Sequence, residues 1–190
     1  MVAHNGFGVI EDARGFSVPR FRIGDRVQVV GDIARFYACP VGIIVQGESD
    51  TASVLNQYTV RLADGTAATF FDFQLQTPPA VTAHLIFDSS TAPKGAGTRG
   101  TAGRQLRLLA RNVDIHLRIS DSPKKTIIGQ ITTGATAVRN ALVTLLIGDQ
   151  IRNTTSTDAV GEFTLSDVAS SEVKIEIVIP SRKILASLTV

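Results

Sequence analysis

Hydrophobic and polar residues alternate through much of the first half of the chain, which predicts short β-strands there. Residues 58–62 alternate so that positions 58, 60 and 62 share one face, and residues 69–75 form a second such run. Between them stands Asp64-Gly65, a dipeptide typical of a tight hairpin turn. Further β-branched strands are expected at 26–30 and 41–45. Because no helical period is present, the pattern predicts a small barrel over residues 18–88.

The second half of the chain shows the same alternation and predicts a β-sandwich over residues 104–190. In residues 113–119, large aliphatic side chains alternate with Asp114, His116 and Arg118, which is typical of a strand with one buried face. The other strands of the sandwich are expected at 125–133, 141–147, 172–179 and 184–190. Residues 104–111 are the exception, because their arginines and leucines favour one or two turns of basic amphipathic helix.

Two segments carry no strand pattern and are expected to lie outside the folded domains. Residues 1–17 are predicted to form an N-terminal arm, and the small, polar, Gly-rich residues 89–103 a flexible linker between two domains. Residues 95–100 match the glycine spacing of a dinucleotide-binding loop. That loop needs a strand before it and a helix directly after it, whereas more Gly and Ala follow here. We therefore expect no nucleotide at this point.

Three short motifs in the first half resemble an SH3-like barrel. They are FRIGDRV at 21–27, GII at 42–44 and YTVRL at 58–62. Their order is similar to that in the barrel domain of the nitrile hydratase β-subunit and its related accessory proteins. That enzyme carries its metal on a Cys-rich motif of its other subunit, and this motif is absent from the chain. The resemblance therefore implies a docking module.

A turn in the second half gives a more specific resemblance. TDAVGEF at 157–163 follows a GQI strand and an ALVTLL strand, and this combination resembles the carboxypeptidase regulatory-like domain, a transthyretin-like (prealbumin-like) sandwich. The opening RQLRLLARNVDIHLRI is similar to the bacterial stand-alone version of that domain. In the turn, Asp158 and Gly161 suit a tight bend, and Phe163 then falls on the buried face of the next strand. The resemblance implies that residues 104–190 accompany an enzyme or signalling protein without doing its chemistry.

Composition indicates a globular protein with two chemically different halves. Hydrophobic residues make up 44% and charged residues 19% of the 190 residues. Residues 1–85 hold six Arg and no Lys against eight acidic residues, whereas residues 86–190 hold thirteen basic and nine acidic residues. The opening residues lack the regions of a secretory signal, and no apolar run is long enough to cross a bilayer. We therefore expect a cytoplasmic protein without membrane contact.

No group of residues in the sequence predicts catalysis, a metal site or a cofactor. His4 lies in the arm, His84 in a run that has the character of an edge strand, and His116 on the polar side of its strand. The single cysteine, Cys39, precedes Pro40 in an apolar stretch and is expected to be a small buried hydrophobic residue. A Cys39 nucleophile paired with a histidine is the alternative. We expect the chain not to be an enzyme.

Aromatic and basic side chains are the candidate partner-binding residues. Phe36 and Tyr37 lie in a segment expected to be an exposed loop, and Phe71 must point away from the face that Phe70 occupies. Tyr58 is expected to face inward. The basic segment 94–125 adds three candidates that would anchor or steer a partner: Arg104, Arg107 and Arg111.

The predicted function is that of a non-catalytic adaptor or accessory protein that binds a protein partner beside an enzyme or signalling complex. Self-association into a structural subunit is a variant of this hypothesis. Two other classes remain open at this point. One is nucleic-acid binding through the barrel and residues 94–125, for which the acidic balance of the first half is unfavourable. The other is a hydrolase with Cys39 as its nucleophile.

Overall fold

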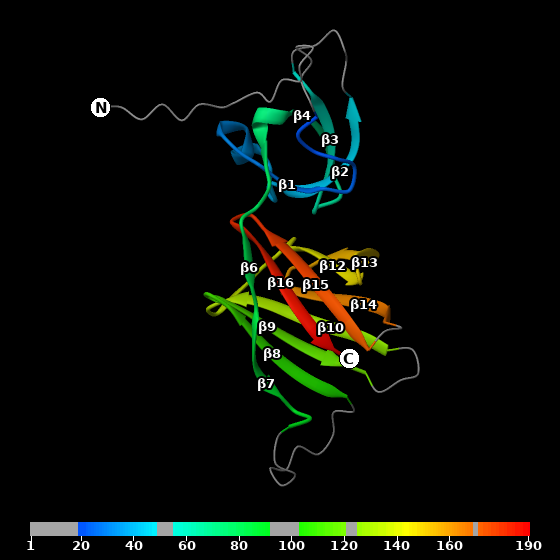
Figure 1. Ribbon diagram of the computed structural model, residues 1–190. Helices are drawn as coiled ribbons and strands as arrows, with labels where there is room; N and C mark the ends of the chain where they lie inside the picture. The colour runs from blue at the N-terminus through cyan, green and yellow to red at the C-terminus, as the bar shows by residue number, and fades with distance from the viewer. Residues whose placement is uncertain (1–18, 49–54, 92–102, 121–124, 169–170) are drawn as a thin grey trace, which may run out of the picture. The chain divides into compact units, whose positions relative to one another are not determined.

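A computed structural model describes residues 19–48, 55–91, 103–120, 125–168 and 171–190 (Figure 1). Strands form nearly all of the regular structure of these residues, and only two short 3-10 helices accompany them. The prediction of an all-β fold is therefore confirmed. The chain divides into two compact units, Met1–Pro78 and Pro79–Val190. The predicted N-terminal arm, residues 1–17, lies outside the described residues.

The first unit is a five-stranded antiparallel sheet in the order β4-β3-β2-β1-β5. Its elements are β1 (Arg26–Val29), η1 (Asp32–Phe36), β2 (Val41–Glu48), β3 (Gln57–Leu62), β4 (Ala67–Phe71), η2 (Asp72–Gln74) and β5 (Leu75–Gln76). The expected barrel is not closed, because among the described residues β4 and β5 end the sheet without pairing to each other. The hairpin turn at Asp64-Gly65 is confirmed: Gly65 has a φ of 89°, and Asp64 Oδ1 accepts the N–H of Thr66 at 2.9 Å.

Alternation in these strands buries one face of the first unit. Tyr58, Val60 and Leu62 of β3 are all buried, so the predicted inward direction of Tyr58 is confirmed. The Tyr58 hydroxyl oxygen accepts the N–H of Phe21 at 3.3 Å, which gives this phenol a hydrogen-bond partner within the core. Phe70 is buried beside them whereas Phe71 is half-buried, as expected for neighbouring residues of one strand.

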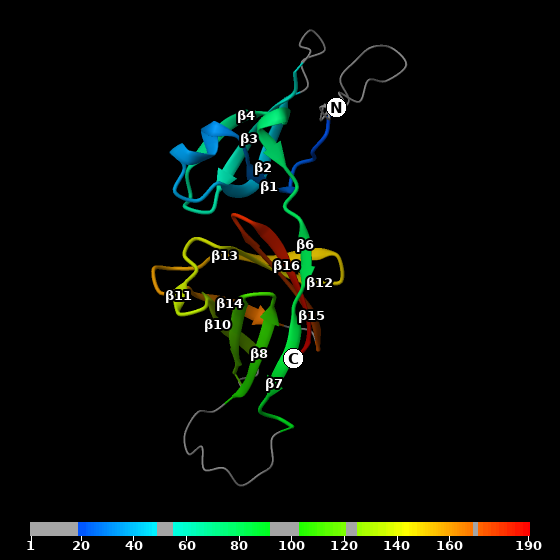
Figure 2. The same ribbon diagram turned by 90° about the vertical axis from the view of Figure 1, so that its left-hand side faces the viewer.

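The second unit consists of two sheets with one hydrophobic core between them (Figures 1 and 2). The first sheet has the order β11-β10-β9-β8-β7, and β14 also pairs with β10; the second has the order β13-β12-β15-β16-β6. The strands of the first sheet are β7 (His84–Asp88), β8 (Arg104–Ala110), β9 (Val113–Ile119), β10 (Lys125–Thr133), β11 (Thr136–Ala137) and β14 (Glu162–Val168). Those of the second are β6 (Ala80–Thr82), β12 (Leu142–Ile147), β13 (Gln150–Ser156), β15 (Glu172–Ile179) and β16 (Arg182–Thr189).

The turn before β14 holds the geometry that its sequence predicts. Asp158 Oδ1 accepts the backbone N–H groups of Val160 and Glu162, each at 2.9 Å. Gly161 has a φ of 78°, and a Cβ there would lie 2.5 Å from the Ile131 carbonyl oxygen. Phe163 follows on the inner side and is buried. Asp158 thus closes the turn, and glycine is required by both its dihedral angle and the close approach of β10.

The prediction of a helix at 104–111 is wrong, because these residues form β8. Leu106, Leu108 and Ala110 are buried, whereas Gln105 and Arg107 on the other face are exposed. This period of two matches the pleat of a strand, and each residue of β8 pairs with one of β9. The row of apolar side chains therefore joins the sandwich core instead of lying on one side of a helix.

Residues 79–88, predicted to end the barrel, instead open the second unit. β6 pairs in parallel with β16, and β7 pairs antiparallel with β8. Between them the Ala83 N–H donates to the Leu185 carbonyl at 2.8 Å, so this extended segment passes from the edge of one sheet to the edge of the other. Residues 89–103 therefore connect β7 to β8 within one sheet and do not join the two units. Of that connection, residues 92–102 lie outside the described residues.

Candidate functional site

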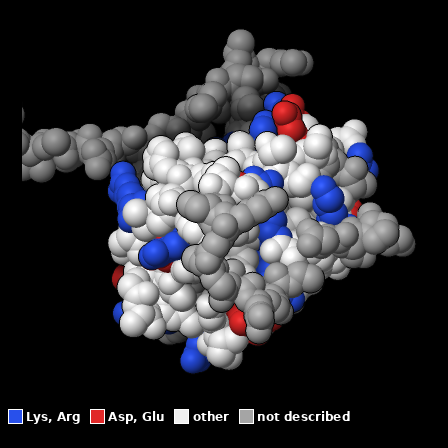
Figure 3. Space-filling model, turned by 90° about the horizontal axis from the view of Figure 1, so that it is seen from below, with Lys and Arg blue, Asp and Glu red and all other residues white. Residues whose placement is uncertain are grey.

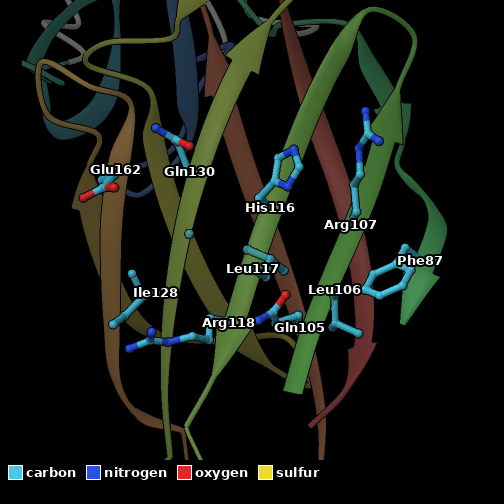
Figure 4. A pocket seen from close by; sticks show the side chains of 11 residues that line it. Phe87, Gln105, Leu106, Arg107, His116, Leu117, Arg118, Ile128, Gln130 and Glu162 are labelled. Atoms are coloured by element: carbon cyan, nitrogen blue, oxygen red, sulfur yellow. The ribbon is translucent and has the colours of Figure 1, made fainter. Parts of the chain in front are cut away.

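A groove crosses the outer face of the first sheet of the second unit, with a volume of about 480 Å³ (Figure 4). Its lining comes from β7, β8, β9, β10 and β14, so it runs across the strands. The side chains that border it are those of Phe87, Gln105, Arg107, His116, Arg118, Ile128, Gln130 and Glu162. These residues are separated in sequence and meet only through the strand register.

Strand register arranges the groove as two rows of side chains with a bare floor between them. Arg107, His116, Gln130 and Glu162 stand opposite one another on neighbouring strands. Gln105, Arg118 and Ile128 form the second row, two residues further along each strand. The row between them, which includes Leu106, Leu117 and Gly129, faces the core. In Figure 4 the Leu117 side chain accordingly lies behind the sheet, whereas His116 and Arg107 project from its front.

Gly129 lies at the middle of this floor, over the ring of Phe163. A Cβ at Gly129 would lie 2.2 Å from Phe163 Cζ and 2.8 Å from Leu117 Cδ2. Glycine is therefore required by the aromatic ring that packs under β10, and not by the groove itself. The same ring links the floor of the groove to the predicted turn at Asp158.

The charges around the groove cancel. Arg107 forms a two-point ion pair with Asp114, with Nε–Oδ1 at 2.7 Å and Nη2–Oδ2 at 3.1 Å, and this contact lowers the pKa of the Asp114 carboxyl. Arg118 and Glu162 are exposed and form no ion pair within the described residues. Two arginines and two carboxylates thus lie in or beside the groove, so their charges sum to zero, and the groove presents both hydrogen-bond donors and acceptors.

β7 borders this groove and is the edge strand of its sheet. Leu85, Ile86 and Phe87 are exposed by 52%, 50% and 46%, although they are consecutive in one strand. The pairing with β8 shifts register between Leu85 and Phe87, which marks a bulge at Ile86. This bulge breaks the alternation of faces and accounts for three neighbouring apolar side chains in solvent. The sequence shows an unbroken apolar triplet next to His84, but it does not show that the three side chains are exposed.

The other edges of the second unit are short or polar. β11 and β6 cover two and three residues. β13 exposes Gln150 and Arg152 beside a single large apolar residue, Ile151, and β14 exposes Glu162 and Thr164. Short length, polar side chains and bulges are among the means by which edge strands avoid pairing with other chains. Within the described residues of the second unit, β7 alone lacks both short length and a polar exposed face, and its protection is the bulge at Ile86.

Arg104 holds together the end of the sandwich next to β7. Its Nε donates to Asp88 Oδ1 at 3.0 Å, and its Nη1 donates to the Thr189 carbonyl of β16 at 2.6 Å. The Asp88 carboxylate is only 8% exposed, and the bound guanidinium lowers its pKa well below the ordinary value. Arg104 therefore connects the two sheets and neutralises the only carboxylate of β7.

The three predicted partner-binding arginines do not form one patch. Arg104 is engaged within the sandwich, Arg107 is paired with Asp114 beside the groove, and Arg111 lies exposed in the β8–β9 turn with a φ of 57°. Residues 94–102 and 121–124 of the basic segment lie outside the described residues. Figure 3 shows Lys and Arg in separate places on the face it presents, with uncharged surface between them. Nothing in the described part of this segment concentrates positive charge as phosphate binding requires.

The predicted aromatic candidates of the first unit also separate. Phe36 is 73% exposed at the end of η1, as expected, but Tyr37 packs edge-on against Phe70 with ring centres 5.3 Å apart. Phe71 stacks on Phe73 with ring centres 5.6 Å apart, and Phe73 is 47% exposed. Phe73 borders a second hollow of about 540 Å³, lined from η1, η2 and β5. Neither Phe36 nor Phe71 lines it.

The candidate nucleophile Cys39 is buried, as its sequence context predicts. It is 2% exposed, and burial raises the pKa of its thiol, so the reactive thiolate is disfavoured. His84 and His116 belong to the other unit, and His4 lies outside the described residues. No three His, Cys, Asp or Glu side chains in the described ranges gather as metal ligands. Neither of the described helices is long and apolar enough to span a membrane.

Comparison of the chain with models of protein families, with curated proteins and with solved structures finds no significant match.

Proposed function

We propose that this chain is a non-catalytic accessory protein that binds an extended segment of a partner protein along β7. The observation that carries the proposal is the exposed triplet Leu85-Ile86-Phe87 on an edge strand. An edge strand offers unpaired backbone groups to another strand, and contiguous exposed apolar side chains mark interaction surfaces. The other edge strands of the second unit are short or expose polar residues, and both features discourage such pairing.

The chemistry of β7 defines the segment that fits it. The strand covers five residues, and its carboxylate, Asp88, is already neutralised by Arg104. A partner strand therefore meets no free charge between positions 85 and 87. The bulge at Ile86 sends side chains to both faces, so apolar residues at successive positions of the partner would pack on either side. The partner segment is accordingly extended, apolar and about five residues long.

The resemblances in sequence support an accessory role as an analogy. The first unit would be a docking module related to SH3-like barrels, and the second would be a regulatory-like sandwich of the transthyretin type. Fold alone does not define function. Both resemblances and the exposed β7 edge favour a binding role over catalysis. We propose that the complex forms in the cytoplasm.

Site-specific photocrosslinking tests the proposal. A photoreactive amino acid at Ile86 in the full chain should capture one partner protein from the native host, and nuclease treatment should leave the adduct intact. Leu85→Lys should abolish this adduct because it places a charge on the edge. The matched control carries the photoreactive group at Ile151, the exposed apolar residue of the polar edge β13, and should give no such adduct.

Three outcomes would contradict the proposal. An adduct of twice the chain mass would show a self-assembling subunit in place of a partner complex. An adduct lost on nuclease treatment would indicate nucleic-acid binding. Equal crosslinking from positions 86 and 151, or none from either, would show that β7 is no special edge.

A further inference from the structure

The groove on the outer face of the first sheet is oriented for a ligand that crosses strands. Strands β8, β9 and β10 are each paired on both sides, so their backbone groups are used within the sheet. A peptide that adds to a sheet must lie along the strands and use free backbone groups at an edge. A ligand in this groove instead lies across them and is recognised by side chains.

The size of the groove suits a short chain molecule. Lining residues come from five neighbouring strands, which at ~4.8 Å between strands span about 19 Å. The two rows of side chains are two residues apart along each strand, so the floor between them is about 7 Å wide. With a volume of about 480 Å³, the groove is within the range of small-molecule sites.

Charge balance selects the chemical class of this ligand. Because Arg107 is neutralised by Asp114, and Glu162 opposes the charge of Arg118, a polyanion gains little net attraction. The imidazole of His116 and the amide of Gln130 each carry a hydrogen-bond donor and an acceptor, and one Gln130 N–H is already donated to the Val160 carbonyl at 3.0 Å. Such a set matches a neutral ligand with many hydroxyl groups, since each hydroxyl is itself both donor and acceptor.

Apolar side chains at the two ends of the groove also fit a ligand that has hydroxyl groups. Phe87 stands at the β7 end and is 46% exposed, and Ile128 on β10 is 39% exposed. A sugar ring carries C–H groups on its faces and hydroxyl groups around its rim. Its faces can pack against Phe87 and Ile128 while its hydroxyls meet the polar rows. Water-filled grooves lined only by charged groups lack this combination.

We propose that this groove binds a short neutral oligosaccharide. His116 and Arg118 contact its hydroxyl groups from the two rows, and Phe87 packs against a sugar ring. The inference goes beyond the proposed partner segment on β7: the two surfaces share Phe87, but Leu85 and Ile86 of that edge do not line the groove. It gives the second unit two binding surfaces on one sheet.

Titration of the isotope-labelled full chain, followed by amide NMR, tests the inference. The probes are maltotetraose, cellotetraose, xylotetraose and N-acetylchitotetraose, each up to about 10 mM, which covers weak binding. At least one should shift amide signals of β8, β9 and β10. His116→Ala and Arg118→Ala should each weaken its affinity about tenfold, the effect of losing one or two hydrogen bonds. Arg152→Ala, which removes an exposed arginine on β13, should leave it unchanged.

The result that overturns the inference is equally specific. If none of the four saccharides shifts signals of the groove, or if His116→Ala and Arg118→Ala leave binding unaltered, the groove is not a saccharide site. Hexaglutamate and a short single-stranded oligodeoxynucleotide serve as competing probes. Tighter, salt-sensitive binding of either one through Arg118 would show an anion site and would equally overturn it.

Discussion

The ion pair between Arg104 and Asp88 allows a quantitative test of how the sandwich is closed. Arg104→Met keeps the aliphatic stem of the side chain and removes two contacts, the pair with Asp88 and the hydrogen bond to the Thr189 carbonyl. It also leaves Asp88, which is 8% exposed, without its cation. Breaking such a pair is costly because the remaining charge stays desolvated.

The expected loss in the free energy of unfolding is about 2–3 kcal/mol. It falls below the cost for a fully buried pair because Arg104 is 28% exposed and because Asp88 keeps the Ser90 N–H at 2.9 Å and the Ser90 hydroxyl at 2.8 Å. For a domain of this size the loss corresponds to a decrease in Tm of roughly 10 °C. Urea unfolding at pH 7 measures it. Arg107→Met is the matched control, because Arg107 lies in the same strand but its ion pair is exposed, and little change is expected.

The pH dependence of the free energy of unfolding tests the same ion pair independently. The pKa of Asp88 in the folded state lies below its ordinary value of 3.8, so the unfolded state binds its proton first as pH falls. The stabilisation is therefore complete at neutral pH and is lost progressively below about pH 4. Arg104→Met should flatten this acid limb of the stability profile. Equal acid sensitivity of wild type and Arg104→Met, or a loss below about 0.5 kcal/mol at pH 7, would refute the role of Arg104.

Two further predictions concern buried groups. Gly129→Ala should destabilise the second unit by about 2–3 kcal/mol in urea unfolding, because its methyl group would overlap the Phe163 ring, and Phe163→Leu in the same chain should restore part of the loss. Gly47→Ala, whose Cβ would meet Tyr58 at an ordinary 3.4 Å, is the control, and an equal loss there would disprove overpacking as the cause. Cys39 should resist a thiol-reactive probe at neutral pH until urea unfolds the chain, since burial raises its pKa; rapid labelling of the native protein would contradict this.

The parts of the fold that sequence predicts well depend on local patterns. Residues 113–119 alternate strictly, and their buried and exposed positions are the predicted ones. The turn at 157–163 is defined by Asp158 and Gly161, whose side-chain acceptor and positive φ act within a few residues. Phe163 then follows from alternation. Here the physical causes lie inside the segment that carries the pattern, so a single sequence is sufficient.

Other features depend on contacts with distant segments. Residues 104–111 contain leucines at spacings that fit a helix as well as a strand, and pairing with β9 decides between the two. Residues 80–88 follow Pro78-Pro79, a pair that ends the preceding strand, but β16, about a hundred residues away, decides to which unit they belong. The groove is harder still, because Arg118, Gln130 and Phe87 meet only once the register of four strands is known.

The passage of residues 80–88 from one sheet to the other also sets the order in which the second unit is completed during synthesis. β6 is the first strand of the second unit to leave the ribosome, whereas its partner β16 is the last strand of that unit to be made. The pair Ala80 and Lys183 shows how far apart in sequence these partners are. Contacts so far apart in sequence form slowly, because a long loop must close before they are gained. β7 can meanwhile pair with β8, which follows soon after it in the chain. The apolar face of the nascent first sheet therefore stays exposed to solvent until β12, β15 and β16 have been synthesised. A chaperone that shields this face is expected to raise the yield of folded protein.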